Sequence, residues 1–261
     1  MTYSEGGGSV SFEALQQGFE KVYYVDLDKW MCNLMKQIKK GIPKEWNKRV
    51  TREEFNELKD KDDAYSVAMS IVWSFWNSRR TYLYGTDREE FKKAAHDAVV
   101  NQDYEWLKKF WIDIELKGTT ILERRLEAKK IFKDGNSNLQ NIQALEHLER
   151  LQHLEIINSS YKNVKIETPI EETVIYCDPP YRWTAEYKVQ EWRFDYKALD
   201  KWFRELPCPA YMSEENPHLT ALTMTKRRLF KMDNAVNVFE VLYTNWKTLE
   251  KKKELVEQPL F

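Results

Sequence analysis

The chain has 261 residues, of which 42% are hydrophobic, and a formal net charge of −1. This composition supports a packed core and excludes general disorder, and the total charge predicts no polyanion partner by itself. Three separated cysteines without a CxxC pair, and four histidines without metal-ligand spacing, predict neither a disulfide framework nor a metal site. No apolar run is long enough for a membrane span, and the N-terminus lacks a signal pattern, so no membrane partner is expected.

The first 40 residues predict a loop, a helix, a strand and a second helix. The glycine triplet Gly6-Gly7-Gly8 precedes a helical pattern that ends near Gly18. A short β-rich run, 22–25, follows and ends at Asp26-Leu27-Asp28, and a helix with a basic C-terminal end runs to Gly41. This order is typical of the opening half of a nucleotide-binding α/β unit.

Residues 43–150 are charged, aromatic and almost free of strand signals. Their periodicity predicts a helical insertion within an α/β fold, with helices at 52–60, 62–77, 88–100, 103–115, 119–132 and 138–150.

Strand signals return from residue 151. A helix is expected at 195–206, and extended runs are expected at 154–160, 164–168, 173–177, 209–213, 227–232 and 237–246. Strands that alternate with helices predict a mostly parallel sheet, and the last two runs predict an antiparallel pair at its edge.

The buried strand at 173–177 ends abruptly in Asp178-Pro179-Pro180-Tyr181. Ligands of open α/β sheets bind beyond the carboxyl ends of strands, and two prolines hold the backbone stiffly there. The Asp178 carboxylate and the Pro179 carbonyl are acceptors beside an aromatic plane. This set suits a flat molecule with an amino group, which donates hydrogen bonds while its ring stacks on Tyr181.

Asp-Pro-Pro-Tyr after an apolar strand resembles the catalytic motif of amino-methyltransferases. The chain as a whole resembles the Dam-type (D12 class) DNA adenine N6-methyltransferases, especially phage-borne members. The resemblance covers nearly the whole chain, from "GGGSVSFEAL" and "VYYVDLDKW" through "YLYG" to "VIYCDPPYR". It implies an α/β, Rossmann-like sheet, residues 1–42 and 151–261, with an inserted helical target-recognition subdomain, 43–150. It also implies a cytoplasmic enzyme, in a bacterial cell or a phage-infected host, with double-stranded DNA as its partner.

The resemblance further implies the reaction and its residues. A methyl group passes from S-adenosyl-L-methionine, without a metal, to N6 of an adenine that has been flipped out of the duplex. Gly6, Gly7 and Gly8 lie under the cofactor, and Asp26, with Asp28 as the alternative, binds its ribose. Asp178, Pro179, Pro180 and Tyr181 hold the adenine.

DNA contacts are expected from local basic charge in the helical block. Arg79 and Arg80 are the preferred pair because they follow Asn77 and lead into an aromatic loop. Arg124 and Arg125 are a second candidate pair.

The chain departs from the family pattern near its start. Only five residues precede Gly6, so we expect a shortened N-terminus that lacks the first strand, and a Pro-Phe before the glycines is absent. Trp76 and Trp183 stand where small residues are expected. Two alternatives therefore stay open, a catalytically impaired DNA-binding homologue and an amino-methyltransferase for another substrate, and so does an oligomer or a partner restriction enzyme.

Overall fold

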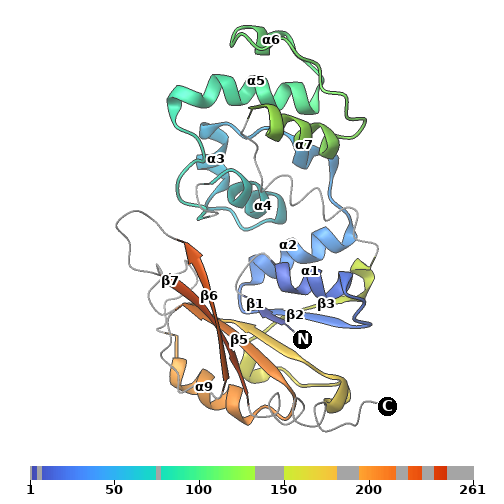
Figure 1. The fold of residues 1–261 in the computed structure, drawn as a ribbon, viewed down its shortest axis with the longest axis vertical. Helices are drawn as coiled ribbons and strands as arrows, with labels where there is room; N and C mark the ends of the chain where they lie inside the picture. Colours follow the sequence, from blue (N-terminus) through green and yellow to red (C-terminus); the bar gives the residue numbers. More distant parts are fainter. Residues whose placement is uncertain are drawn as a thin grey trace. The chain divides into compact units, whose positions relative to one another are not determined.

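The computed structural model describes residues 2–4, 8–74, 78–132, 150–180, 194–215, 223–230 and 238–245. The chain divides into two compact units (Figure 1). One consists of residues 1–32 and 150–261, and the other of residues 33–149. We describe each unit by itself.

The first unit contains a sheet in which the seven described strands have the order β3-β2-β1-β4-β5-β7-β6. The strands are β1 Thr2–Ser4, β2 Val22–Asp26, β3 Leu154–Asn158, β4 Ile175–Asp178, β5 Ala210–Glu215, β6 Thr223–Phe230 and β7 Val238–Thr244. Strands β1 to β5 pair in parallel, whereas β7 runs antiparallel to both β5 and β6. The mostly parallel sheet with an antiparallel pair at one edge is therefore confirmed.

The expectation that the first strand is missing is wrong. Thr2–Ser4 forms β1, which pairs in parallel with β2 on one side and β4 on the other. Three residues are enough here because both neighbours supply hydrogen-bonding partners, so that the strand depends little on its own propensity. A second expectation also fails, since residues 164–168 form no strand.

The core of this unit lies between the sheet and helix α9 (Tyr196–Glu205). Leu199 and Phe203, which are one helical turn apart, pack against Tyr23 and Val25 of β2 and Ile175 of β4. All five residues of β2 are buried, and successive side chains of a strand point to opposite faces, so both faces of β2 are covered. Helix α1 (Ser9–Gln16) lies on the face opposite α9 (Figure 1).

The second unit is helical among its described residues. After α2 (Lys29–Lys40), which spans the boundary between the units, come α3 Arg52–Leu58, α4 Ala64–Val72, α5 Glu89–Val100, α6 Glu105–Lys108 and α7 Ile121–Phe132. Most of the expected helices are present, but the helix expected at 103–115 is reduced to the single turn of α6. The helix expected at 138–150 lies almost wholly outside the described residues.

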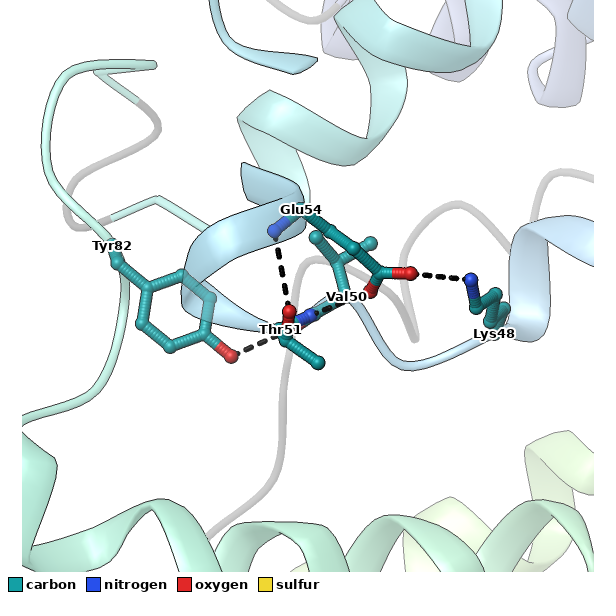
Figure 2. Close-up of polar contacts among 5 residues, drawn as sticks. All are labelled: Lys48, Val50, Thr51, Glu54 and Tyr82. Atoms are coloured by element: carbon teal, nitrogen blue, oxygen red, sulfur yellow. Dashed lines mark hydrogen bonds and ion pairs between the residues drawn. The ribbon is translucent and has the colours of Figure 1, made fainter. Parts of the chain in front are cut away.

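Helix α3 begins at a complete capping box (Figure 2). The Thr51 hydroxyl accepts from the Glu54 amide at 3.2 Å, and the Glu54 carboxylate accepts from the Thr51 amide at 2.9 Å. Lys48 forms an ion pair with the same carboxylate, and the Tyr82 hydroxyl donates to the Val50 carbonyl at 2.7 Å. These bonds join the loop around Tyr82 to the start of α3.

Helix α6 stops early because the backbone turns into a left-handed conformation at Trp111, where φ is 60°. The Ile112 amide donates to the Leu107 carbonyl and the Trp111 amide to the Lys108 carbonyl, which is the bonding pattern of a Schellman C-cap. Glycine usually occupies this position, because a side chain there costs about 1–2 kcal/mol. Tryptophan therefore stands where folding favours glycine.

Arg124 of α7 is buried, and its guanidinium group joins three segments of the unit. Its Nε donates to the Val99 carbonyl at 2.6 Å, and its Nη1 donates to the Gly118 and Thr119 carbonyls at 3.0 Å. These bonds fix α7 to the end of α5 and to the loop that precedes α7.

Replacing Arg124 by methionine should destabilise the protein by about 2–4 kcal/mol, because buried carbonyl groups lose their charged donor. Chemical denaturation measures this change in the free energy of unfolding. Arg80→Met is the matched control, since Arg80 is exposed and its loss should change stability by less than about 0.5 kcal/mol. Equal stabilities of the two variants would contradict the role given to Arg124.

Candidate active site

The carboxyl ends of neighbouring strands meet at one edge of the first unit's sheet. Ser4 of β1 is in register with Asp178 of β4, and Tyr3 of β1 is in register with Val25, the residue before Asp26. The chain winds from β1 to β2 and β3 in one direction, and from β4 to β5 in the other. The order thus reverses between β1 and β4, which is the place where open α/β sheets bind their ligands.

Asp178 is oriented by its neighbours in the sheet. The Ser213 hydroxyl of β5 donates to Asp178 Oδ1 at 2.9 Å, and the Tyr176 hydroxyl donates to Ser213 Oγ at 3.0 Å. Tyr176 and Asp178 are two residues apart and share one face of β4, and the register places Ser213 beside Asp178. Ser213 is only 2% exposed. Its hydroxyl is therefore shielded from water, and both of its hydrogen bonds are strengthened by the low local dielectric constant.

Pro179 and Pro180 directly follow Asp178, and both are buried. The carbonyl of Pro180 accepts a hydrogen bond from the Tyr196 hydroxyl, at the start of α9, at 3.0 Å. This bond ties the rigid turn to the helix that packs under the sheet. Tyr181 and Trp183 lie outside the described residues.

Asp26 is a buried carboxylate at the end of β2. Its Oδ2 accepts from the Tyr24 hydroxyl at 2.8 Å, and its Oδ1 accepts from the Asp28 amide at 2.8 Å. Burial raises the pKa of Asp26 to about 7, because desolvation outweighs the hydrogen bonds that favour the ionised form. A carboxyl group of this kind suits a ligand that brings hydroxyl donors.

Asp28 caps the N-terminus of helix α2. Its Oδ1 accepts from the Trp30 amide at 2.8 Å and from the Met31 amide at 3.3 Å, at the first turn of α2. These are the bonds of a helix N-cap. Of the two aspartates considered for ribose binding, the geometry therefore favours Asp26.

Of the three glycines before α1, the structure describes Gly8, while Gly6 and Gly7 lie outside the described residues. Gly8 is buried and has a φ of 72°, a left-handed conformation, and its carbonyl accepts the first hydrogen bond of α1 from Phe12. Glycine is favoured here, since a side chain would strain this left-handed backbone.

The basic residues expected to contact DNA differ in their placement. Arg80 is exposed, and Asn77 lies outside the described residues. The Arg79 guanidinium is bound within the unit, with Nε donating to Ser70 Oγ at 2.8 Å and Nη2 donating to the Lys61 carbonyl at 2.8 Å.

Arg124 and Arg125 are both buried, 5% and 7% exposed. Burial lowers the pKa of Arg125 to about 10, and the carbonyl contacts of Arg124 are internal to the helical unit. In this conformation neither side chain presents its charge to a phosphate. The sequence does not reveal which face of α7 is covered, so the burial of these two residues could not be predicted from it.

Ser213, Tyr176 and Tyr196 are site residues that the sequence reasoning missed. One feature of the sequence points to Ser213, because it is a small polar residue directly after the apolar run of β5. Its meaning depends on the register with β4, which a single sequence does not give. The tyrosines resemble ordinary strand and helix residues.

Among the described residues, no group of three histidine, cysteine, aspartate or glutamate side chains is arranged to hold a metal ion. Within the same ranges no helix is long and apolar enough to cross a bilayer.

Comparison with curated proteins finds no match. The model of the D12 class N6 adenine-specific DNA methyltransferases matches residues 5–212, a span that contains Gly8, Asp26 and Asp178 and ends one residue before Ser213. This chain therefore belongs to the D12 class N6 adenine-specific DNA methyltransferase family.

Proposed function

We propose that this protein transfers a methyl group from S-adenosylmethionine to N6 of adenine at specific sites in double-stranded DNA. The observation that carries the proposal is the placement of Asp178 and Asp26 at the carboxyl edge of the sheet, on either side of β1, in a chain of this family. Open α/β sheets bind nucleotides at such an edge.

The residues at this edge fit S-adenosylmethionine, which supplies an electrophilic methyl group when bound. Gly8, with Gly6 and Gly7 before it, provides backbone without side chains at the start of α1. Asp26 offers carboxylate oxygens to the two ribose hydroxyls, whereas Asp28 caps α2. We therefore assign ribose binding to Asp26.

Asp178 has the central part in the chemistry. The N6 lone pair of adenine is delocalised into the ring, and acceptors that bind the amino hydrogens favour a pyramidal nitrogen with a localised lone pair. Ser213 donates to Oδ1 of Asp178 and so restricts the orientation of the carboxylate, which accepts from the amino group, and the Pro179 carbonyl serves as the second acceptor. Tyr181 stacks on the base. Catalysis thus rests on positioning and electrostatics.

The adenine has to leave the duplex, because N6 of a paired base is inside the double helix. We assign the recognition of the DNA to the helical unit, residues 33–149, with exposed Arg80 as its phosphate contact. Arg79 has a positioning role, since its hydrogen bonds to Ser70 and Lys61 fix the backbone next to Arg80.

The second candidate function is that of an impaired homologue that only binds DNA. Calorimetry with S-adenosylmethionine distinguishes such a homologue from an active methyltransferase. Such a protein would bind DNA without binding the cofactor. An amino-methyltransferase for RNA or protein would bind the cofactor and leave DNA unmethylated.

Asp178→Asn should lower the rate of methyl transfer to unmethylated DNA at least about 100-fold, since it removes the charged acceptor. Ser213→Ala should lower kcat about tenfold and leave the KM values for DNA and cofactor unchanged, because it releases the carboxylate without removing it. Tyr176→Phe should have a smaller effect of the same kind. Transfer from labelled S-adenosylmethionine measures all three.

The double variant Asp178→Asn/Ser213→Ala tests whether Ser213 acts through Asp178. If it does, the double variant should be no slower than Asp178→Asn alone. Additive losses, or a Ser213→Ala effect confined to KM, would show that Ser213 has a separate role. Undiminished transfer by Asp178→Asn would sink the assignment of Asp178 and the proposed mechanism.

The affinity for S-adenosylmethionine should rise as the pH rises towards about 7, and then level off. Below this value the Asp26 carboxyl is protonated, because its pKa is raised to about 7, and above it the ionised group accepts fully from the ribose hydroxyls. Calorimetry between about pH 5.5 and 8.5 measures the dependence. Asp26→Asn should bind weakly and with a flatter pH profile, and an identical profile in wild type and variant would rule out Asp26 as its source.

A further inference from the structure

Trp111 is the most exposed of the large hydrophobic residues that the structure describes, at 97%. It lies just after α6, a single helical turn at the edge of the helical unit (Figure 1). Its backbone is left-handed, with φ of 60°, at a C-cap position where glycine is favoured. Neither packing nor backbone preference accounts for tryptophan here, and such strained positions often carry function.

The helical turn that precedes Trp111 in the chain carries a second aromatic ring with basic charge beside it. Trp106 of α6 is 45% exposed, the Lys109 ammonium lies 4.0 Å from its ring centroid, and the Lys93 ammonium of α5 lies 5.6 Å from it. Lys93 and Lys109 are exposed. We call Trp106, Trp111, Lys93 and Lys109 the tryptophan tip.

Nucleic acid is the partner that this chemistry fits. Exposed aromatic rings stack on the uncovered bases of single strands, apolar side chains can insert between base steps of a duplex and unstack them, and ammonium groups beside them bind phosphates. Asp113 and Glu115 are also exposed on the segment after Trp111, which weakens any purely electrostatic attraction to DNA. Stacking of the ring, more than charge, should therefore hold DNA at this place.

We propose that the tryptophan tip is a DNA-contact surface of the helical unit, at which the ring of Trp111 stacks on a base of the target DNA. The inference rests on the proposed function, because it takes DNA as the substrate. It adds a contact that basic residues do not provide, in a unit where Arg124 and Arg125 are buried.

The test compares wild type with Trp111→Gly and Trp111→Tyr, using a short fluorescein-labelled duplex of mixed sequence and fluorescence anisotropy. Trp111→Gly should weaken DNA binding about tenfold, since it removes a stacked ring. Its Tm should be unchanged or about 2–4 °C higher, because glycine suits the left-handed backbone. Trp111→Tyr should keep most of the affinity, since tyrosine retains an aromatic face.

The dependence of affinity on salt separates stacking from phosphate contact. The slope of log K against log salt should be the same in wild type and Trp111→Gly, since the variant loses no charge, whereas Lys109→Ala should flatten it. Phe19→Ala is the matched control, because Phe19 is an exposed aromatic residue of the other unit, 47% exposed. It should leave DNA binding unchanged.

Two results would overturn the inference while leaving the proposed function intact. One is wild-type DNA affinity in Trp111→Gly, and the other is loss of self-association in that variant without loss of DNA binding, which would make the tip a contact between copies of the chain. If folded wild type itself neither bound nor methylated DNA, the proposed function would fail first, and this inference with it.

Discussion

The candidate site depends on the parallel pairing of β1 with β2 and β4. This pairing brings the carboxyl ends of three strands to one edge, although β4 lies far from β1 and β2 in the sequence. Asp26 and Asp178 are 152 positions apart in the chain, yet β1 alone separates their strands. Without Thr2–Ser4 in the centre, the two carboxylates would have no common edge at which to meet one ligand.

The same sheet also orients the side chains that it brings together. Because strand side chains repeat every two residues, Tyr176 and Asp178 share a face, and the register with β5 places Ser213 beside them. The buried hydroxyl of Ser213 then fixes one carboxylate oxygen of Asp178. A group that works by positioning benefits from this arrangement, since its orientation is set before any substrate arrives.

The sequence identifies residues whose type and local order carry meaning. Asp178 and the prolines follow a buried strand, and Asp26 ends another, so both aspartates could be predicted with the correct strands. Ser213 could not, because its importance arises from register between strands that a single sequence does not define. Thr2–Ser4 lacks the length and alternation of a typical strand, and is one only because two neighbours pair with it.

Burial is the other property that local patterns did not supply in the helical unit. Arg124 and Arg125 have the charge of a DNA contact, but tertiary packing gives Arg124 three internal carbonyl partners. Tryptophan is a large hydrophobic residue of the kind expected in a core, but Trp111 lies just after the early end of α6 and is exposed. In both cases the environment, which depends on neighbouring segments, decides the role.

In the proposed mechanism, Asp178 and its neighbours present the amino group of adenine for methylation. Nucleoside mass spectrometry of DNA incubated with the folded protein and S-adenosylmethionine identifies the product. We expect N6-methyldeoxyadenosine and no other methylated nucleoside. Methylated cytosine, or DNA that stays unmethylated while the protein is folded and binds the cofactor, would contradict this mechanism.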